Sequence, residues 1–481
     1  MVAIMHKQLR FNKYLLLVFS SLFTWGCVGQ SNTAKVGTEV ANNSGAITQT
    51  QVIKLDPAQG DYRLGGLIAA DLNNDNRQDF IITKPDHIAA YSNSGQKLWS
   101  KRVNIHLSSK SEDHGLPGNQ APGVQAADVD GDNQSEVVFF TQDGKLQIVD
   151  GLSGEIEHQI KLESPSGAEQ WEHLVVANFQ GRGDRDLLLQ ATNKEGYRMG
   201  RYLAAYSFSE LLQSDNPQPL WRHDDFLANA HNGARVADLD GDGKDEVLGG
   251  TIISSQGEVL FRLPLELKSR PHIDSLFVAD VRPDLPGLEI VALEEGGQNR
   301  VFLYGIQGLI WETDYKNQEP QNAAIGDFDP DRPGLEIWCR SRYNHDQKPF
   351  VFDAQGKLIS EYVMNQVKPG DWTEKGVEVI FTIFWTGESQ PLAAAKERHK
   401  TGDVAIFNPM SGEFIERFDD SADRLYVADV SGDWREELLV LNGNRLRIYS
   451  NLAPNPQPEQ SRLWSLNHYR RNKMTWNYYS P

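Results

Sequence analysis

Short apolar runs recur along almost the whole chain, and polar loops rich in Asp, Asn and Gly separate them. The first unit contains the runs 67–71, 79–83, 87–91 and 97–103, and a Ser-Asn-Ser-Gly turn joins the last two. Apolar runs of this length between turn residues predict β-strands rather than helices. Four such strands joined by short loops predict an antiparallel meander.

One acidic phrase separates the first and second strands of each unit. Its clearest copy reads Ala-Asp-Leu-Asp-Gly-Asp-Gly-Lys-Asp-Glu and begins at Ala237. The copies, including weaker variants and a degenerate Pro-Gly-Asp-Trp version, start at or near Asp71, Asp128, Asn178, Asp238, Asp280, Asp327, Asp371 and Asp429. Their spacings of 42 to 60 residues are typical of propeller blades and not of a helical solenoid. The repeat therefore predicts an all-β fold, a β-propeller of four-stranded blades, with eight blades by motif count and seven if the Asp371 unit forms no blade.

Large aromatic residues recur towards the end of the units. Trp99, Trp221, Trp311 and Trp464 fall where fourth strands are expected. Because the fourth strand is the outermost of a blade, we expect these rings to cover the contact between neighbouring blades.

The N-terminal region differs in composition from the repeats. Basic residues followed by an apolar run predict a signal peptide over residues 1–27. Cys27 only partly matches a lipoprotein cleavage box because Thr24 replaces the usual Leu, so a lipid anchor to the outer membrane and ordinary cleavage both stay open. Residues 28–51 predict a flexible linker, and residues 52–481 predict one β-propeller catalytic domain. The expected location is secreted, or periplasmic with an outer-membrane anchor.

Charge and cysteine content narrow the function classes. The formal net charge of −19 argues against nucleic-acid binding. Only Cys339 remains after Cys27, so we expect no internal disulfide, and packing and bound ions must hold the fold outside the cytoplasm. We expect the protein to be a monomer.

The acidic loops have the composition of calcium sites. Oxygen-bearing side chains at positions 1, 3, 5 and 9, with Gly between them, can converge on one hard cation. A motif that repeats in most blades indicates structural Ca²⁺, because a catalytic metal needs an open coordination position. The expected ligands are Asp71, Asn73, Asp75, Asp79, Asp128, Asp130, Asp132, Glu136, Asp238, Asp240, Asp242, Glu246, Asp327, Asp329, Asp331 and Glu336. Gln180, Arg182 and Arg282 replace ligands in the copies at Asn178 and Asp280, and we expect no ion there.

Cationic and aromatic residues gather on the rim opposite the acidic loops. That rim carries the links between blades and the loops between second and third strands, which are rich in His, Arg and Tyr. An acidic protein that concentrates such residues on one rim is suited to an extended polyanion lying in a groove. Whether a catalytic metal binds among these histidines stays open.

Three stretches resemble one group of enzymes. They are Asp327–Glu336, His231–Glu246, and Gly432–Glu437 followed by Leu446–Tyr449. Together they are similar to the β-propeller polysaccharide lyases, namely the rhamnogalacturonan lyase group and the related ulvan lyases of marine bacteria. We expect no counterpart of the extra segment and longer ending of the rhamnogalacturonan lyases, and a compact secreted propeller is more similar to the ulvan lyases.

The resemblance implies β-elimination from a uronic acid. The C5 proton of the uronate is weakly acidic, so the carboxylate must be neutralised before a base removes that proton and an acid assists the departure of the oxygen at C4. Loop placement offers His231 or His114 as the base, with His173 as the next choice. It offers Tyr197 as the acid. Arg201 or Arg235 would neutralise the carboxylate. The expected substrate-binding residues are Asn119, Gln120, Arg270, His272, Arg342 and Tyr343.

The sequence thus favours a secreted polysaccharide lyase that cleaves a rhamnose and uronic-acid polymer. Ulvan, an acidic sulfated polysaccharide, is the first choice of substrate. The alternatives are a rhamnogalacturonan lyase and a non-catalytic, calcium-stabilised carbohydrate-binding propeller. A glycosidase is disfavoured because it would need a pair of facing carboxylates on the substrate rim.

Overall fold

The computed structural model describes residues 48–59, 65–105, 123–193, 199–229, 233–266, 272–314, 319–342, 346–398 and 401–475. These residues belong to one compact unit, Val36–Pro481. The predicted signal peptide, and the predicted linker up to residue 47, lie outside the described residues.

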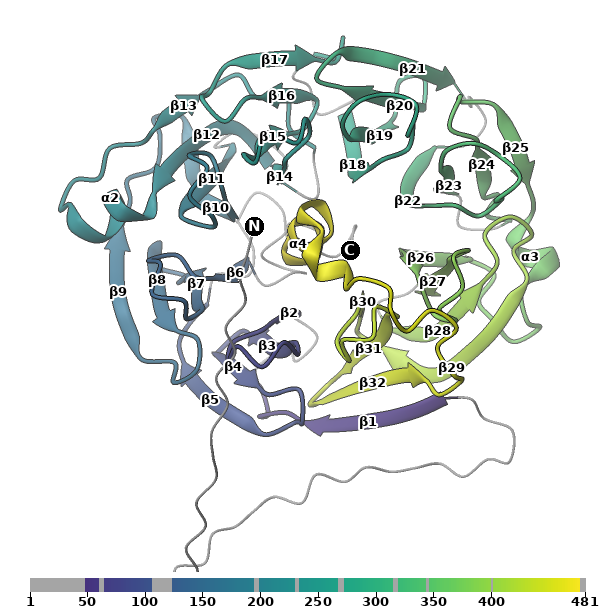
Figure 1. Ribbon diagram of the computed structural model, residues 1–481, viewed down its shortest axis with the longest axis horizontal. Coiled ribbons are helices and arrows are strands. Elements are labelled where there is room, and N and C mark those ends of the chain that lie inside the picture. Colours follow the sequence, from purple (N-terminus) through teal and green to yellow (C-terminus); the bar gives the residue numbers. More distant parts are fainter. Residues whose placement is uncertain are drawn as a thin grey trace, which may run out of the picture. The chain divides into compact units, whose positions relative to one another are not determined.

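The described strands form eight antiparallel sheets of four strands, and the sheets stand in a ring (Figure 1). Blades 1 to 4 contain β2 (Gly66–Ala70), β3 (Asp79–Lys84), β4 (His87–Tyr91), β5 (Lys97–Arg102); β6 (Val124–Ala127), β7 (Glu136–Phe140), β8 (Lys145–Asp150), β9 (Ile156–Lys161); β10 (Ala168–Ala177), β11 (Asp186–Asn193), β12 (Met199–Ser207), β13 (Trp221–His223); and β14 (Arg235–Ala237), β15 (Glu246–Leu248), β16 (Thr251–Ile253), β17 (Val259–Arg262). Blades 5 to 8 contain β18 (His272–Ala279), β19 (Glu289–Glu295), β20 (Arg300–Gly305), β21 (Gly308–Asp314); β22 (Pro320–Gly326), β23 (Glu336–Ser341), β24 (Phe350–Phe352), β25 (Leu358–Glu361); β26 (Val377–Ile383), β27 (Leu392–Glu397), β28 (Gly402–Phe407), β29 (Phe414–Ala422); and β30 (Arg424–Ala428), β31 (Glu437–Asn442), β32 (Arg445–Asn451) with β1 (Thr48–Lys54). The eight-bladed propeller predicted from the motif count is confirmed.

The N-terminal strand closes the ring. β1 is the outer strand of blade 8, where Thr48 pairs with Asn451 and Lys54 pairs with Arg445 of β32. The first described strand of the chain therefore completes a blade whose other three strands come last. Within the described part of the chain, the propeller begins at Thr48, which falls in the segment predicted as linker.

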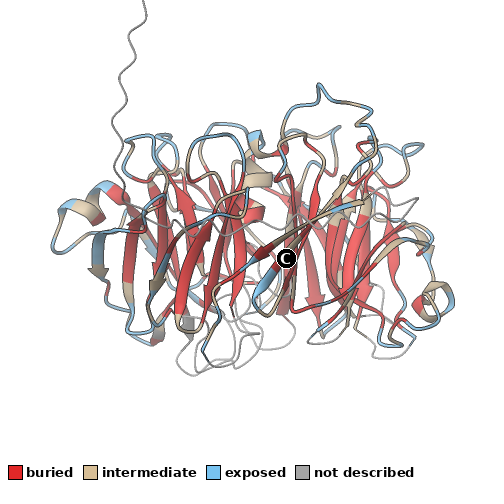
Figure 2. Ribbon diagram, turned by 90° about the horizontal axis from the view of Figure 1, so that it is seen from below, coloured by how far each residue is buried: buried red, intermediate tan, exposed pale blue. Residues whose placement is uncertain are grey.

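Neighbouring blades bury the inner strands on both faces (Figure 2). In blade 1 every residue of β2, β3 and β4 is buried, whereas β5 is mostly exposed or half-buried. The apolar clusters lie between blades, and one of them joins Ile68 and Ile81 of blade 1 to Val124 and Val137 of blade 2. Burial on both faces explains why the runs are continuously apolar rather than alternating.

A tryptophan on the outer strand of one blade packs against a glycine turn of the next. Nε1 of Trp99 donates to the carbonyl oxygen of Gly151 at 2.8 Å. Gly154 in the same turn has φ of 70°, and a Cβ at Gly154 would lie 2.5 Å from the Trp99 ring. The same arrangement recurs between later blades, with the bonds Trp221 to Ser255 at 3.1 Å and Trp311 to Ala354 at 2.9 Å. The predicted contact between blades is confirmed for these three tryptophans.

The prediction for Trp464 is wrong. Trp464 lies in η1 (Leu463–Ser465), after the last strand, and its Nε1 donates to the carbonyl oxygen of Asp429 at 2.6 Å. The outer strand of blade 8 is β1 instead. The sequence period alone could not show that an N-terminal strand supplies this position.

The Asp371 phrase is not the acidic loop of blade 7. Asp371 lies between α3 (Met364–Val367) and β26, and it pairs with Arg417 of β29 at 2.6 Å. Residues 384–391 join the first and second strands of this blade, and they contain no Asp-x-Asp pattern. The number of blades is right, but the motif of this unit was assigned to the wrong segment.

A C-terminal helix lies at the centre of the ring (Figure 1). α4 (Asn467–Met474) contacts the innermost strands β2, β6, β14 and β18. Arg471 is buried and pairs with Asp184 at 2.9 Å and with Asp245 at 2.6 Å. Lys473 is also buried, and its Nζ lies 3.0 Å from Glu436. α4 therefore places two buried cations beside carboxylates of the loops that join first and second strands.

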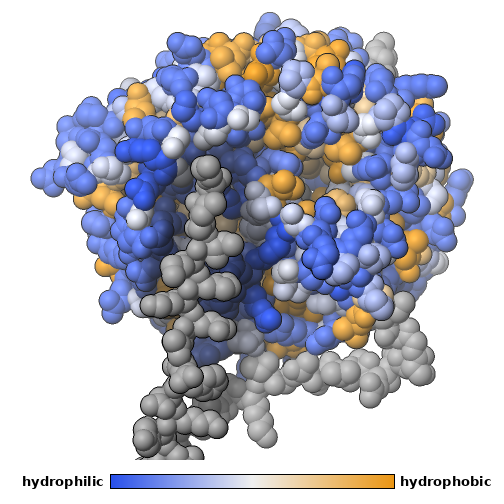
Figure 3. Space-filling view, viewed as in Figure 1, coloured by the Kyte–Doolittle hydropathy of each residue, from blue (hydrophilic) through white to orange (hydrophobic). Residues whose placement is uncertain are grey.

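The remaining helix of the described segments, α2 (Phe208–Gln213), follows the third strand of blade 3. Among the described residues, the helices are too short and too polar to cross a membrane. Figure 3 shows mostly hydrophilic residues on the face of the propeller seen in Figure 1, with apolar residues scattered among them. On that face we expect contacts with partners to be polar.

Candidate functional site

The acidic loops lie on one rim of the propeller, beside the turns that join third and fourth strands. In blade 1 the backbone N–H of Asn93, in the turn after β4, donates to Oδ1 of Asp79 at 2.9 Å. The Asn93 side chain donates to the carbonyl oxygen of Gln78, in the acidic loop, at 3.1 Å. The shared rim that the sequence predicted for these two kinds of loop is confirmed in this blade.

Two acidic loops bring their carboxylates together. In blade 4, ligand-type oxygens of Asp238, Asp240 and Glu246 lie within 4.8 Å of one another. Backbone N–H groups of Gly241 and Gly243 donate to the Asp238 carboxylate at 2.8 and 3.1 Å, which fixes its orientation. The matching residues of blade 2 form the same grouping: Asp128, Asp130 and Glu136.

Burial and neighbouring carboxylates perturb the titration of these loops. Burial, with the charges of Asp240 and Asp242, raises the pKa of Glu246 to about 8. Burial, followed by nearby carboxylates, also raises the pKa of Glu136 to about 8 and the pKa of Asp79 to about 6. A cation offsets the electrostatic cost of ionising such grouped carboxylates, so the donor set fits Ca²⁺.

The other predicted calcium ligands make mainly local contacts. Asp71 and Asn73 accept hydrogen bonds from the backbone N–H of Asp75 at 3.2 and 2.9 Å. In blade 6, Asp329 pairs with Arg332 at 2.7 Å. The remaining predicted ligands lie in the same loops or at the start of the second strands: Asp132, Asp242, Asp327, Asp331 and Glu336.

A different kind of potential metal site lies in blade 5, at the opposite end of the strands from the acidic loops. His272 begins β18, Asp274 follows two residues later, and Glu295 ends β19, where it pairs with His272 across the ladder. One ligand-type atom from each of the three lies within 4.8 Å of the others, and His272 Nε2 is 3.4 Å from Glu295 Oε2. All three are buried, with exposed fractions of 6%, 0% and 2%. An imidazole with two carboxylates is a donor set that binds divalent cations.

Arg342 extends this cluster towards blade 6. It directly follows β23, and its NH1 lies 2.5 Å from Glu295 Oε1 and 2.5 Å from Glu319 Oε1. The hydrogen bond to Glu319 and the charge of Glu295 raise the pKa of Arg342. Arg398 donates to the Arg342 carbonyl oxygen. Arg342 is therefore held in its charged form beside the buried ligands.

Sequence reasoning selected His272 and Arg342 but missed Asp274 and Glu295. A signal for both residues exists in the sequence. His-x-Asp begins one strand and Glu ends the next, and the two strands form a hairpin. Antiparallel pairing brings the start of one strand beside the end of its partner, so these positions must meet.

His173 and Arg235 are buried in the propeller core. Nε2 of His173 lies 2.8 Å from the carbonyl oxygen of Ala234, and burial lowers the pKa of His173 to about 4. NH1 of Arg235 donates to Asn472 Oδ1 at 3.2 Å and to Thr475 Oγ1 at 3.3 Å. Arg235 therefore contacts the C-terminal helix region, and His173 is neutral near pH 7.

Arg201 lies apart from the blade 5 cluster. It is an exposed residue of β12, the third strand of blade 3. Its guanidinium stands 4.8 Å from the centre of the Tyr202 ring and donates to the Tyr202 hydroxyl at 2.9 Å. Among the described candidates, the cations Arg201, Arg235 and Arg342 thus lie in different blades, namely 3, 4 and 6.

Several predicted site residues lie outside the described residues: His114, Asn119, Gln120, Tyr197, His231, Arg270 and Tyr343. One backbone contact bears on His231. Asn229, which precedes the undescribed segment 230–232, forms a parallel bridge with Ile273 of β18. The chain that leads to His231 therefore runs beside the strand that carries His272 and Asp274.

The comparison with family models gives two matches. The model described as rhamnogalacturonan lyase family 11, C-terminal domain, matches residues 192–479, which is more than half of the chain. A model of FG-GAP-like repeats matches residues 71–139, a segment with two acidic loops. The first match covers the blade 5 cluster and Arg342.

Two curated proteins agree with the first match. The chain is 25% identical to the rhamnogalacturonan endolyase YesW of Bacillus subtilis (strain 168), over 85% of this chain and 67% of that protein. It is 23% identical to the rhamnogalacturonan exolyase YesX of the same strain, over 76% of this chain and 64% of that protein. The chain thus spans about two thirds of the length of these relatives.

Solved structures of the same kind share the propeller fold. The crystal structure of exotype rhamnogalacturonan lyase YesX has a TM-score of 0.66 at 18% identity, over 90% of this chain and 78% of that chain. The rhamnogalacturonan lyase PL11 of Bacillus licheniformis has a TM-score of 0.62 at 18% identity, with the same coverage.

Proposed function

Because the chain belongs to rhamnogalacturonan lyase family 11, we propose that it is a polysaccharide lyase that cleaves the rhamnose and uronic-acid backbone of rhamnogalacturonan by β-elimination. The relatives named above are an endolyase and an exolyase for rhamnogalacturonan. They favour the rhamnogalacturonan alternative over ulvan, the first choice from sequence. Whether cleavage is internal or terminal is decided by the product sizes.

The observation that carries this proposal is the buried cluster of His272, Asp274 and Glu295 beside Arg342. β-Elimination requires that positive charge offset the uronate carboxylate while the C5 proton leaves. A divalent cation bound by the three ligands would supply that charge at the substrate carboxylate. Their burial and their spacing within 4.8 Å fit such an ion.

The chain's own residues position this site. Glu295 contacts both His272 and Arg342, so it couples the ligand set to a permanent cation. Arg342 is also held by Glu319, and we propose that it orients a second acidic group of the polymer. His231 remains our candidate base, because only two peptide units separate it from Asn229, which pairs with Ile273.

We further propose that the acidic loops of blades 2 and 4 bind Ca²⁺ as structural ions. Their carboxylates converge, backbone N–H groups orient Asp238, and their hard oxygen donors suit calcium. They lie at the opposite ends of the strands from the blade 5 cluster. The two kinds of site are therefore separable by mutation.

The test is to follow the ultraviolet absorbance of the unsaturated uronate when the protein is incubated with rhamnogalacturonan, polygalacturonate or ulvan. We expect product from rhamnogalacturonan and a loss of about 10²-fold or more in kcat/KM in Asp274→Asn. The matched control is Asp215→Asn, which removes an exposed carboxylate after α2. Product from ulvan alone would restore the first choice, and binding without product from any polymer would indicate a non-catalytic propeller.

A further inference from the structure

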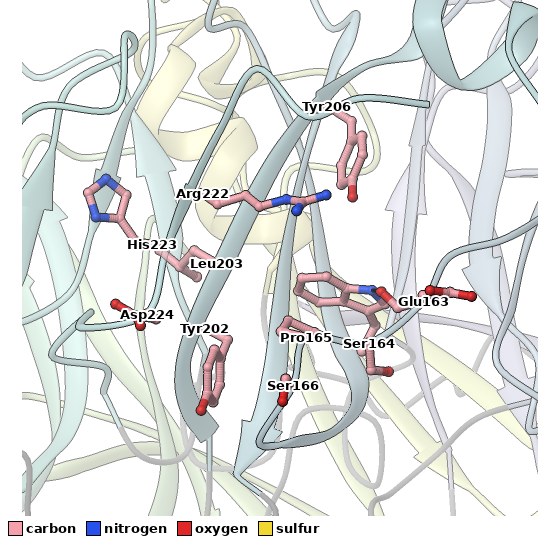
Figure 4. Close-up of a pocket in the computed structure, with 11 residues that line it drawn as sticks. Glu163, Ser164, Pro165, Ser166, Tyr202, Leu203, Tyr206, Arg222, His223 and Asp224 are labelled. Atoms are coloured by element: carbon pink, nitrogen blue, oxygen red, sulfur yellow. Dashed lines mark hydrogen bonds between the residues drawn. The ribbon is translucent and has the colours of Figure 1, made fainter. Parts of the chain in front are cut away.

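A pocket unrelated to the blade 5 cluster lies in the region of blades 2 and 3 (Figure 4). Its volume is about 570 Å³, within the range of small-molecule sites. Its wall combines the aromatic residues Trp171, Tyr202 and Tyr206 with the charged residues Glu163, Arg222 and Asp224. No residue of the blade 5 cluster lines it.

The alternation of β12 explains the hollow. Tyr202, Ala204 and Tyr206 point to the same face of the strand because side chains alternate. Ala204 adds little volume between the two rings, and the residue opposite it on β13 is Arg222. The pocket is therefore open between two tyrosines and is overhung by an arginine.

The aromatic walls are fixed in place. Nε1 of Trp171 donates to the carbonyl oxygen of Glu163 at 3.0 Å, and the Tyr202 hydroxyl accepts from Arg201 at 2.9 Å. Trp171 and Tyr202 are buried, with exposed fractions of 7% and 8%. Rigid aromatic faces of this kind bind sugar rings with little loss of conformational entropy.

Two polar groups aimed into the pocket have no partner in the described part of the chain. Arg222 is exposed, and no hydrogen bond or ion pair joins it to another described residue. Tyr206 is 97% buried, with an exposed fraction of 3%, yet its hydroxyl makes no hydrogen bond to a described residue. Figure 4 shows the Tyr206 hydroxyl and the Arg222 guanidinium pointing towards the same part of the pocket. A guanidinium beside a hydroxyl suits a carboxylate.

We propose that this pocket is an accessory binding site for an acidic sugar residue, with its carboxylate on Arg222 and Tyr206 and its ring against Trp171. The exposed carboxylates Glu163 and Asp224 accept hydrogen bonds from sugar hydroxyls and repel the acidic group from their own ends of the pocket. This inference rests on the proposed function in one respect: the acidic sugar is taken to be a uronate of the polymer. The site holds a second part of the polymer on the same propeller and so raises the polymer's effective concentration at the catalytic site.

The first test is a binding cycle measured by titration calorimetry. The probes are a saturated oligogalacturonide and its methyl ester, and the variants are Arg222→Gln and Tyr206→Phe. We expect Arg222→Gln to weaken binding of the acid at this site about 10-fold or more and to abolish its preference over the ester. Tyr206→Phe weakens it less. The control is Arg445→Gln, which removes an exposed arginine of β32.

The second test uses turnover of polymeric rhamnogalacturonan. Loss of the accessory site raises KM for the polymer, and the effect appears in KM rather than in kcat. An unchanged acid-over-ester preference in Arg222→Gln overturns the inference even if the enzyme is active. A lost preference without turnover of any polymer supports the pocket and refutes the proposed function, so the two failures are distinguishable.

Discussion

Replacing Arg471 with Met should destabilise the propeller strongly, because the change leaves a buried carboxylate without its cationic partner. The Arg471 side chain is 5% exposed, and it pairs with Asp245, which is fully buried, and with Asp184. It also donates to the carbonyl oxygen of Val176 at 3.0 Å. Removing one partner of a buried ion pair costs about 3–5 kcal/mol. Because Asp184 keeps a second pair with Arg470, we expect a loss of free energy of unfolding near the lower limit, about 3 kcal/mol.

The assay is urea unfolding followed by tryptophan fluorescence, with the slope of the transition checked for constancy. Arg470→Met is the matched control: Arg470 is 32% exposed and its one ion pair in the described residues is with Asp184, so we expect a loss of about 1 kcal/mol or less. In the double variant Arg471→Met with Asp245→Asn, the loss should fall below the sum of the single losses. A loss in Arg471→Met no larger than that in Arg470→Met would refute the reasoning.

Three further predictions concern ions, pH and blade contacts. Chelating divalent cations should lower the melting temperature, because an ion that binds only the folded state stabilises it. Asp240→Ala should reproduce part of that loss. An identical melting curve would exclude calcium in the acidic loops. Burial lowers the pKa of His173 from 6.5 to about 4, so its contribution to stability is complete above pH 6.5 and disappears as pH falls towards 4, by up to about 3 kcal/mol. Unfolding free energies measured from pH 7 to 4 should therefore decline less in His173→Gln, and parallel declines would contradict this. Gly154→Ala should lower the free energy of unfolding in urea by about 1–3 kcal/mol, because its Cβ would meet the Trp99 ring. Gly144→Ala, at a similar φ but with open space around it, should lower the free energy of unfolding less. Equal losses would show that the clash with Trp99 does not contribute.

The architecture was predictable because one physical constraint repeats in every blade. Strands buried on both faces must be apolar, and their turns must carry Asp, Asn and Gly. The apolar runs 79–83 and 87–91 therefore predicted β3 and β4 almost to the residue. The prediction weakened where the constraint is absent. The loop 384–391 of blade 7 contains no Asp and lacks the acidic phrase, so Asp371 was chosen in its place.

The site was less predictable because it depends on strand pairing that brings together residues which no repeated motif links. His272 was found as a lone histidine, but Asp274 and Glu295 gain meaning only from the register of β18 and β19. The sequence of α4, Asn-His-Tyr-Arg-Arg-Asn-Lys-Met, is that of an exposed helix. Arg471 and Lys473 are buried only because carboxylates of inner loops face them, and no local pattern encodes that.

The closure of blade 8 by β1 imposes an order on biosynthesis. β1 leaves the ribosome before the other described strands of the propeller, but its partner β32 follows only after seven blades and two strands have been made. Until then β1 has no strand partner and the flank of the growing arc is uncovered, and both are prone to pair with other chains. A stop codon placed before Arg445 should therefore yield aggregates rather than a shorter propeller.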